Sequence, residues 1–543
     1  MKSRFHPSRV LLIFLLVFCC YGFKNVRQST VVILSFNDLH GQIDPFIEEE
    51  EKEGSKEKVE IGGCSRIASL IRSAKSRYPH AVLTVSSGDN LLGPYFNRLQ
   101  GQAIGTILSS MGLDVATLGN HDFDQGETML ARALAFCRFP IVVSNLKITT
   151  DKRPLAGRIS EYRVFERSGV KIGVFGIITP ALPLLSGGAK DIKVKADFTA
   201  EAHRIAEILR RKEGVDIVVA LTHIGLEEDE KLAEAVEGLD VICGGHTHDS
   251  LFKGDEVVIR HPNGRSTIIT QAGSLGRYLG FLELTIRNGR IVEHLWEPIR
   301  IDTGIPEDPE VEELIRSFRN RMPEKRTLTV CTVPLDCRML TVRSREAAAG
   351  DLVCDAVREY FKVDIALQNG GGIRGDAILP AGPLSDKDLD TLLPFGNPVV
   401  ILKLKGSVIK QALERSVASW PKPAGAFLQE SGLRYQVQPG RKPQELRSED
   451  TAAEPASPPF PGERIAKAEV EQQDGSFQPL SSENVYTVAV NGFLASGGDG
   501  YFMFKNAESA APTNTSVYEA VKSILAARPE ISPAPDGRIQ FTK

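Results

Sequence analysis

The sequence predicts an α/β protein with two domains, and three observations support this fold class. From residue 31 to about 285, short β-branched apolar runs alternate with polar or glycine-rich turns and helical stretches. Such alternation is typical of an α/β sandwich, in which helices cover buried strands. Near residue 300 one amphipathic helix interrupts the pattern, and a second α/β region follows it.

The strands expected in the first domain are continuous apolar runs, as in sheets that are covered on both faces. The charged run from Glu48 to Glu60 lacks this pattern and is expected to be a solvated loop. The expected strands are 31–36, 82–85, 115–118, 141–143, 171–178, 216–221, 240–243 and 267–270.

A linker helix is expected over residues 308–322. Asp308 and Pro309 suit an N-cap and a first turn, and Val311 and Ile315 begin an apolar face that continues through Phe318. The second domain contains a stretch rich in Pro, Ser, Glu and Arg at 438–462, which predicts a surface loop. The predicted segments are a first domain at 29–303, a linker helix within 304–327 and a second domain at 328–543.

The composition narrows the class of protein. The chain has 543 residues, of which 25% are charged and 42% hydrophobic, and its formal net charge is −4. These proportions are ordinary for a globular protein and exclude a disordered chain, a collagen and a multi-span membrane protein. The small negative charge argues against a dedicated nucleic-acid-binding protein, because such proteins usually carry a basic face.

The N-terminus has the pattern of an export signal. Three basic residues precede the apolar run 10–18, which is too short to span a bilayer comfortably. We therefore expect residues 1–23 to be a cleaved signal peptide and the mature protein to be periplasmic, secreted or at the cell surface. An uncleaved anchor and a lipid on Cys19 or Cys20 are the alternatives. Because the C-terminal residues are polar, we expect no glycolipid anchor.

Cysteine is sparse in the rest of the chain. Six cysteines remain after residue 23, too few for a disulfide framework in a chain of this length. Cys331 and Cys337 are the nearest candidates for a pair, whereas Cys243 lies in an apolar run and is expected to be a buried free thiol.

Polar motifs rich in histidine, aspartate and asparagine follow the predicted strands. Ligands of open α/β sheets bind beyond the carboxyl ends of the strands, so five such motifs can converge on one site. The motifs are Asn37–Gly41 (NDLHG), Ser87–Asn90 (SGDN), Gly119–Asp124 (GNHDFD), Thr222–His223 and Gly244–His248 (GGHTH).

The spacing within two of these motifs favours metal ligation. In an extended chain residues i and i+2 point the same way, so Asp38 with His40, and His246 with His248, can each present two ligands. Mixed imidazole and carboxylate donors suit Zn, Mn, Fe or Co better than Ca or Mg. The candidate ligands outnumber the needs of one ion, which suggests two ions that share a bridging carboxylate.

Taken together, these motifs resemble the calcineurin-like metallophosphoesterase series, and the longer forms GNHDFD and GGHTHD are similar to the exported 5′-nucleotidase / UDP-sugar hydrolase family. The resemblance covers roughly residues 30 to 540. It implies a four-layer α/β/β/α sandwich, a second α/β substrate-binding domain and two divalent transition-metal ions (Zn, Mn or Co). It also implies one metal held by Asp38, His40, Asp89 and His248, and a second held by Asp89, Asn120, His223 and His246, with Asp89 as the bridge.

The resemblance assigns catalytic roles as well. His121 is not needed as a ligand, and the resemblance implies that it stabilises developing charge or protonates the leaving oxygen. Asp124 would orient its ring. The attacking group would be a water shared by the two metals.

The second domain is expected to bind the substrate. Asn369 begins the turn NGGGIR after an apolar strand, and its glycine amides and Arg374 suit an anion such as phosphate. The resemblance adds Arg343, with Arg345 beside it. It further implies a base held between Phe395 and Phe493, and a ribose bound by Asp499.

One position departs from the family pattern. Asp351 stands where family members usually carry Asn, which adds negative charge near the Arg343 motif. The resemblance also implies that the two domains rotate about the linker. We expect Pro309 and the loop before it to lie near that hinge.

The resemblance therefore implies a dimetal phosphohydrolase that releases phosphate from nucleoside 5′-monophosphates, with UDP-sugars as an open second substrate class. The substrate partner that the resemblance implies is a nucleotide or nucleotide sugar, and we expect no nucleic acid polymer as a partner. Three alternatives remain: a 2′,3′-cyclic-nucleotide 2′-phosphodiesterase/3′-nucleotidase, a sulfur-compound thiohydrolase and a non-catalytic surface-binding protein. NGGGIR and the two Phe positions favour a nucleotide, and the complete ligand set argues against a non-catalytic protein.

Overall fold

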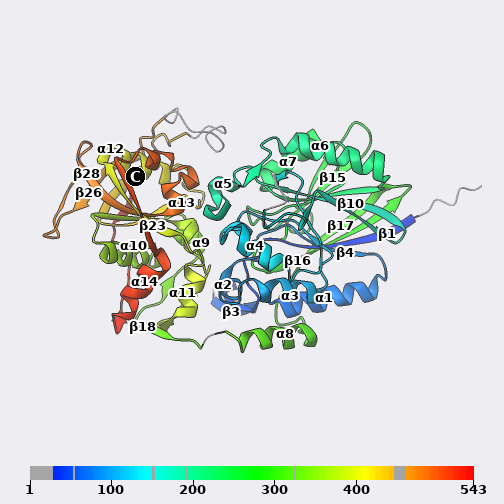
Figure 1. Cartoon of the computed structure of the whole chain (residues 1–543), viewed down its shortest axis with the longest axis horizontal. Helices are drawn as coiled ribbons and strands as arrows, with labels where there is room; N and C mark the ends of the chain where they lie inside the picture. Colours follow the sequence, from blue (N-terminus) through cyan, green and yellow to red (C-terminus); the bar gives the residue numbers. More distant parts are fainter. Residues whose placement is uncertain are drawn as a thin grey trace, which may run out of the picture.

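The computed structural model describes residues 28–52, 55–148, 153–189, 192–322, 324–445 and 460–542. The predicted signal peptide, with Cys19 and Cys20, lies outside these residues. Figure 1 shows two lobes side by side, the first built from the N-terminal half and the second from the C-terminal half. Within the described ranges no helix is long and apolar enough to cross a membrane.

The first domain contains two sheets that face each other. Their shared interior is apolar and includes Ile33 and Val85 from one sheet and Val174 and Val219 from the other. The seven-stranded sheet has the order β17 (Arg290–Arg300), β16 (Tyr278–Arg287), β1 (Gln28–Phe36), β4 (Val82–Ser86), β5 (Val115–Ala116), β6 (Ile141–Val142) and β8 (Ile159–Ser160). The six-stranded sheet has the order β14 (Val257–Arg260), β15 (Ser266–Thr270), β13 (Val241–Cys243), β12 (Ile217–His223), β10 (Val170–Ile178) and β9 (Tyr162–Arg167).

Helices cover the outer face of each sheet. The seven-stranded sheet packs against α1 (Cys64–Arg77), α3 (Gln102–Met111) and α4 (Gly126–Leu134). The six-stranded sheet packs against α6 (Phe198–Ile208) and α7 (Leu226–Ala235). This is the predicted four-layer α/β/β/α arrangement, and each of the eight predicted runs contains a strand of one of the sheets.

The loop expected at Glu48–Glu60 is wrong, because this segment forms a β-hairpin. Strand β2 (Phe46–Lys52) pairs antiparallel with β3 (Ser55–Ile61). Contacts at the base of the hairpin hold it in place: the Arg277 guanidinium lies 5.2 Å from the Phe46 ring centroid, and its Nε donates to Glu48 at 3.1 Å. These partners are more than 200 residues away, so the local charge pattern does not reveal the strands.

The predicted linker helix exists as α8 (Pro309–Arg319) and is capped by the Asp308 carboxylate, which accepts from two backbone amides. Its apolar face, formed by Val311, Ile315 and Phe318, belongs to the core of the first domain and packs with α1 and α3. The loop before α8 also contacts this domain, because the backbone amide of Asp308 donates a hydrogen bond to the carbonyl oxygen of Ser65. The packing therefore disfavours a pivot at Pro309.

The second domain is an α/β structure around a five-stranded sheet. One face packs against α10 (Ala348–Phe361) and α14 (Val517–Ala526), and the other against α12 (Gly406–Ser416). The sheet order is β24 (Leu428–Ser431), β20 (Ile365–Asn369), β28 (Val485–Asn491), β23 (Pro398–Lys405) and β29 (Ser509–Ser516). A four-stranded sheet has the order β27 (Phe477–Pro479), β26 (Ile465–Glu471), β25 (Leu433–Val437) and β31 (Ile539–Phe541). A three-stranded sheet has the order β22 (Gly382–Ser385), β18 (Thr327–Cys331) and β30 (Glu530–Ile531).

The cysteines of the described chain are free thiols, including Cys331 and Cys337, which were the nearest candidates for a pair. Cys243 is a buried free thiol, as expected. The central part of the predicted surface loop at 438–462 lies outside the described residues.

Candidate active site

The predicted ligands lie at strand ends that the sheet order brings together. Strands β1, β4 and β5 are parallel neighbours, as are β12 and β13 in the facing sheet. Their carboxyl ends therefore meet at one edge of the sandwich. The loops that leave these ends carry Asp38 and His40, Asp89, Asn120, His223, and His246 and His248.

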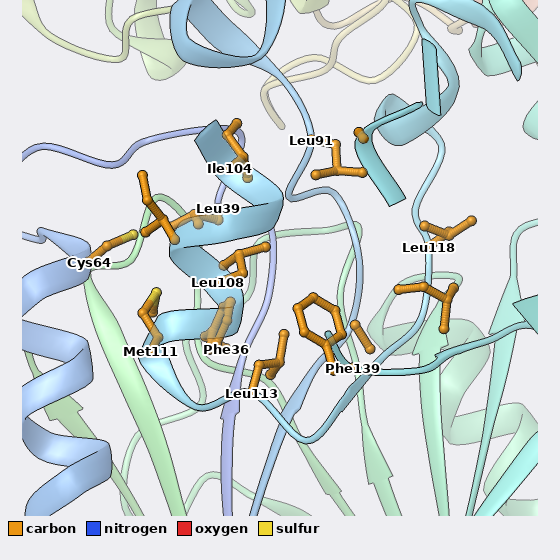
Figure 2. Packing of buried hydrophobic residues seen from close by; sticks show 14 of the residues in the cluster. Phe36, Leu39, Cys64, Leu91, Ile104, Leu108, Met111, Leu113, Leu118 and Phe139 are labelled. Atoms are coloured by element: carbon orange, nitrogen blue, oxygen red, sulfur yellow. The ribbon is translucent and has the colours of Figure 1, made fainter. Parts of the chain in front are cut away.

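Apolar side chains between the ligands anchor these loops. Figure 2 shows Leu39, Leu91 and Leu118 in the buried core that surrounds α3. Their exposed fractions are 0%, 4% and 2%. Each leucine is next to, or two residues from, a predicted ligand, so burial of the leucine fixes the direction of the polar side chain beside it.

The ligand loops have an unusual backbone. Asp38, His40, Asp89, His246 and His248 all have positive φ, between 49° and 83°. This left-handed conformation is costly for residues other than glycine and is concentrated at functional sites. The extended geometry expected for the two His-containing pairs is therefore wrong. Asp38 and His40 still lie in one cluster, whereas His248 contacts His40 and His246 contacts His223.

The side chains form two adjoining clusters. In the first, the Nε2 atoms of His40 and His248 lie 3.0 Å apart, and Asp38 Oδ1 is 3.3 Å from His248 Nε2. In the second, His223 Nε2 is 3.1 Å from Asp89 Oδ2 and 3.9 Å from Asp38 Oδ1. Asp38 thus belongs to both clusters as the structure has them.

Unsatisfied buried atoms in these clusters fit metal ions. Asp38 Oδ1 and Asn120 Oδ1 are buried and make no hydrogen bond, and the buried His223 Nε2 faces only the carboxylates of Asp89 and Asp38. Buried polar atoms are normally paired, because an unpaired one loses the free energy of hydration. Carboxylate, amide and imidazole donors gathered in two adjoining clusters suit divalent transition metals.

The histidine pKa values agree with this interpretation. Burial lowers the pKa of His246 to about 4, with His223 as a second cause. Burial, reinforced by the Arg374 guanidinium, holds the pKa of His40 well below its usual value. Both rings are therefore neutral near pH 7, which is the form that binds metals. Burial disfavours charge on His223, but Asp89 and Asp38 outweigh it and raise its pKa to about 10, so this pocket favours a cation.

Asp122 organises the ligand loops, a role that the sequence reasoning missed. Its buried carboxylate accepts from the backbone amides of Asp89, Asn90, Leu91 and Gly119 at 2.7–3.0 Å. Burial and the charge of Asp89 raise its pKa to about 7. The position of Asp122 inside GNHDFD was a signal, since an acid beside a ligand often orients the ligand loop.

His121 lies between the two domains. Its Nδ1 is 2.7 Å from Asp124 Oδ2, and its Nε2 is 2.8 Å from Nη2 of Arg374 in the second domain. A guanidinium can only donate, so Nε2 accepts and the ring proton is on Nδ1, which donates to Asp124. The Phe395 ring stacks on His121 with centroids 5.2 Å apart.

One cavity of about 250 Å³ joins the two domains. Arg345, expected beside Arg343, is exposed and does not line the cavity. Asp38, His40 and His223 do not line it, and His40 lines a second, smaller cavity. The predicted residues that line it are Asp89, Asn120, His121, Asp124, His246 and His248 from the first domain, and Arg343, Asn369, Arg374, Phe395, Phe493 and Asp499 from the second.

The second-domain loops are tied to one another around this cavity. Asn369 Nδ2 donates to Asp499 Oδ2 at 2.8 Å. The Nε atoms of Arg343 and Arg374 are buried without a hydrogen-bond partner. Two guanidinium groups with unmet donors on one wall are suited to a bound anion.

Asp351 is buried away from the cavity, at the start of α10. Its side chain is 2% exposed, and its nearest cation is Arg538, whose Nε is 3.6 Å from Oδ1. Burial raises its pKa to about 8, although Arg538 opposes the shift. The departure from the family pattern therefore affects the helix start and leaves the lining of the cavity unchanged.

Comparison with known proteins identifies the family. The model of calcineurin-like phosphoesterases matches residues 31–250, and the model of the 5′-nucleotidase C-terminal domain matches residues 327–506. A snake venom 5′-nucleotidase from Naja atra is 30% identical over 94% of this chain and 98% of its own length. The chain belongs to the 5′-nucleotidase family.

Two further members of the 5′-nucleotidase family extend the comparison. The 5′-nucleotidase of Bos taurus is 29% identical over 95% of this chain and 92% of its own length. The crystal structure of a 5′-nucleotidase precursor from Thermus thermophilus has a TM-score of 0.81 and 30% identity, and covers 95% of this chain and 100% of its own. The chain is therefore a phosphohydrolase with both domains of the family, which implies divalent metal ions and a nucleotide substrate.

Proposed function

We propose that this protein hydrolyses nucleoside 5′-monophosphates to a nucleoside and phosphate. One observation carries the proposal: a single cavity is lined by candidate metal ligands and His121 from one domain and by two arginines and two phenylalanines from the other. A phosphate near the ligands would then be joined to a nucleoside held against the second domain.

The metal sets we propose are those that the family resemblance implies, with Asp89 shared between a set containing Asp38, His40 and His248 and a set containing Asn120, His223 and His246. The support is the unpaired state of buried donors in both sets. A pair of divalent ions such as Zn, Mn or Co lowers the pKa of a water molecule and neutralises charge on phosphoryl oxygens.

His121 acts on the leaving oxygen in this proposal. Asp124 accepts from Nδ1 and fixes the ring, so that Nε2 points into the cavity toward Arg374. When a phosphate binds the Arg374 guanidinium, His121 Nε2 becomes free to take up a proton from solvent. The protonated ring then gives this proton to the departing nucleoside oxygen as the bond from phosphorus to that oxygen breaks.

The second domain binds the rest of the substrate. Arg343 and Arg374 hold the phosphoryl group through donors that have no partner in the structure. Phe395 and Phe493 stack on the base, and Asp499 with Asn369 binds the ribose hydroxyls. Stacking contacts the face of a base and not its edge, so we expect tolerance among bases.

Nucleotide sugars are a second proposed substrate class, because a second cavity adjoins the first. It has a volume of about 90 Å³ and shares Arg343, Arg374 and His248 with the lining of the first cavity. Met339 and Thr391 contribute to its wall. A group attached to the far side of the phosphate could extend into this space.

The test is a substrate panel with metal control. Purified protein is assayed with AMP, UDP-glucose, 2′,3′-cyclic AMP and a sulfur ester, before and after chelation and with Mn, Co or Zn added back. Metal-dependent release of phosphate from AMP is expected. Preference for the cyclic nucleotide or the sulfur ester would replace the proposal with that alternative. Loss of UDP-glucose turnover in Met339→Trp, with AMP turnover kept, would support the second substrate class.

We also propose export, which rests on the basic and apolar pattern of residues 1–23. N-terminal sequencing of the protein from its native source is expected to begin after residue 23. An intact Met1 on cytosolic material would contradict this.

A further inference from the structure

One short segment of the second domain supports both arginine loops of the cavity. The Ala424 amide donates to the Arg343 carbonyl at 3.0 Å. The amides of Gly370 and Gly371, in the turn that leads to Arg374, donate to the Phe427 and Gly425 carbonyls at 2.7 and 2.9 Å. Residues 424–429 therefore connect two loops that are not close in sequence.

The last residue of this segment, Gln429, forms hydrogen bonds to the Arg343 loop with both polar atoms of its side-chain amide. Its Nε2 donates to the carbonyls of Val342 and Arg345 at 3.0 and 2.7 Å, and its Oε1 accepts from the Ala347 amide at 3.1 Å. Gln429 is 0% exposed. The loop between α9 (Met339–Val342) and α10 is thus held on both sides of Arg343 by one amide.

Gly350 provides the space that this side chain needs. A Cβ atom built on Gly350 would lie 2.3 Å from Gln429 Oε1 and 2.4 Å from its Cγ. Gly350 is inside α10, where glycine is otherwise unfavourable. Packing against Gln429 is therefore the physical reason for glycine at this position.

Arg343 depends on its backbone for its position. It lines the cavity, and its Nε is buried without a hydrogen-bond partner. Because no hydrogen bond holds the Nε atom of this side chain before an anion binds, the backbone of the loop has to position the guanidinium.

We propose that Gln429 is a positioning residue for Arg343, and that its three hydrogen bonds set the affinity of the enzyme for the phosphate group of its substrate. The proposal rests on the proposed function, in which Arg343 contacts that phosphate. Loss of the three bonds lets the loop relax while the metal ligands, in the other domain, keep their positions.

The experiment measures KM, kcat and the inhibition constant of inorganic phosphate in the full-length enzyme. Gln429→Met keeps the size of the side chain and removes its hydrogen bonds. We expect KM for AMP and the inhibition constant of phosphate to rise about tenfold each, with kcat within about twofold of wild type, because the loss is one of ground-state binding.

A matched control is available in the same domain. Gln444 is also buried, and its Nε2 donates to two backbone carbonyls, those of Gln411 and Pro461, but it does not line the cavity. Gln444→Met should leave KM unchanged. Equal increases in KM in both variants would show a general packing effect and overturn the proposal.

A double-mutant cycle with Arg343→Ala separates positioning from structure. If Gln429 acts through Arg343, Gln429→Met has no further effect on KM in the Arg343→Ala background. A full additional effect there would overturn the proposal, as would a wild-type KM for Gln429→Met beside a raised KM for Arg343→Ala. A wild-type KM for Arg343→Ala itself would overturn the assignment of Arg343 in the proposed function and this inference with it.

Gly350→Ala keeps the proposal testable if Gln429→Met does not fold. Alanine is the better helix former, so an increase in KM would not come from a loss of helix propensity, and the added Cβ would meet Gln429. We expect this variant to raise KM and the phosphate inhibition constant as Gln429→Met does. Wild-type values for a folded Gly350→Ala would overturn the proposal.

Discussion

Replacement of Asp122 by Asn is expected to destabilise the first domain and disturb both metal sets. Asp122 Oδ1 accepts from the amides of Asn90 and Leu91, and Oδ2 accepts from those of Asp89 and Gly119. A side-chain amide has one oxygen, so Asn can accept hydrogen bonds from only one of these two pairs of backbone amides. Its NH₂ group would face the other two N–H donors, which are buried.

The magnitude follows from the two lost hydrogen bonds. Above pH 7, where the Asp122 carboxylate is mostly ionised, each bond to this charged acceptor contributes about 1.5 kcal/mol or more, so the free energy of unfolding falls by about 3 kcal/mol. At about 2–4 °C per kcal/mol for a domain of this size, Tm falls by about 6–12 °C. Since Asp89 and Asn120 lie on the disturbed loops, bound metal and kcat/KM should fall as well.

The assay combines thermal unfolding, metal analysis and AMP hydrolysis. Asp114→Asn is the control, because Asp114 also accepts from a backbone amide, that of Thr84, but lies away from the ligand loops. A Tm and a metal content equal to wild type in Asp122→Asn would refute the role assigned to Asp122. Equal losses in the control would show that any carboxylate of this sheet has the same effect.

Three further predictions concern pH, glycine and metal. Because burial raises the pKa of Asp351 to about 8 against the opposing charge of Arg538, the folded state binds more protons than the unfolded state between about pH 4 and pH 8, and stability falls as pH rises through that window. Asp351→Asn should flatten the decline in Tm, and an unchanged decline would contradict the shift. A Cβ in Gly119→Ala would lie 2.1 Å from Asp89 Oδ1 and 2.6 Å from His223 Cε1, so metal content should drop severalfold, whereas full occupancy would show that the site can expand. Chelation should abolish AMP hydrolysis and lower Tm, since ligands that bind the folded state stabilise it; full activity after verified metal removal would exclude the dimetal mechanism.

The sequence was informative about the first domain because its chemistry follows local patterns. Continuous apolar runs identify buried strands, and the polar residues that follow them are at the carboxyl ends of those strands by geometry alone. Asp38, Asp89 and His246 could therefore be assigned to one site before their contacts were known. Adjacent leucines such as Leu39 reinforce the pattern, since they are buried at 0–4% exposure beside the ligands.

Other features depend on contacts between residues far apart in the chain. The Gln429 side chain reaches Ala347 across 82 residues, and the Arg277 side chain reaches Glu48 across 229. Neither partner has a local pattern that indicates the other, which is why the β2–β3 hairpin was expected to be a loop. The apolar face of α8 predicts burial, but not that the first domain supplies the surface that buries it.

The sequence by itself determined the types of residue available for catalysis, the strand ends that carry them and the family to which the chain belongs. Only the tertiary structure decided the left-handed backbone of the ligand loops, the support by Asp122 and Gln429, and the selection of Arg343 over Arg345 for the cavity. The physical reason is that hydrophobic periodicity is a property of neighbours in the chain, whereas hydrogen bonds between loops depend on how the packed sheets bring distant segments together.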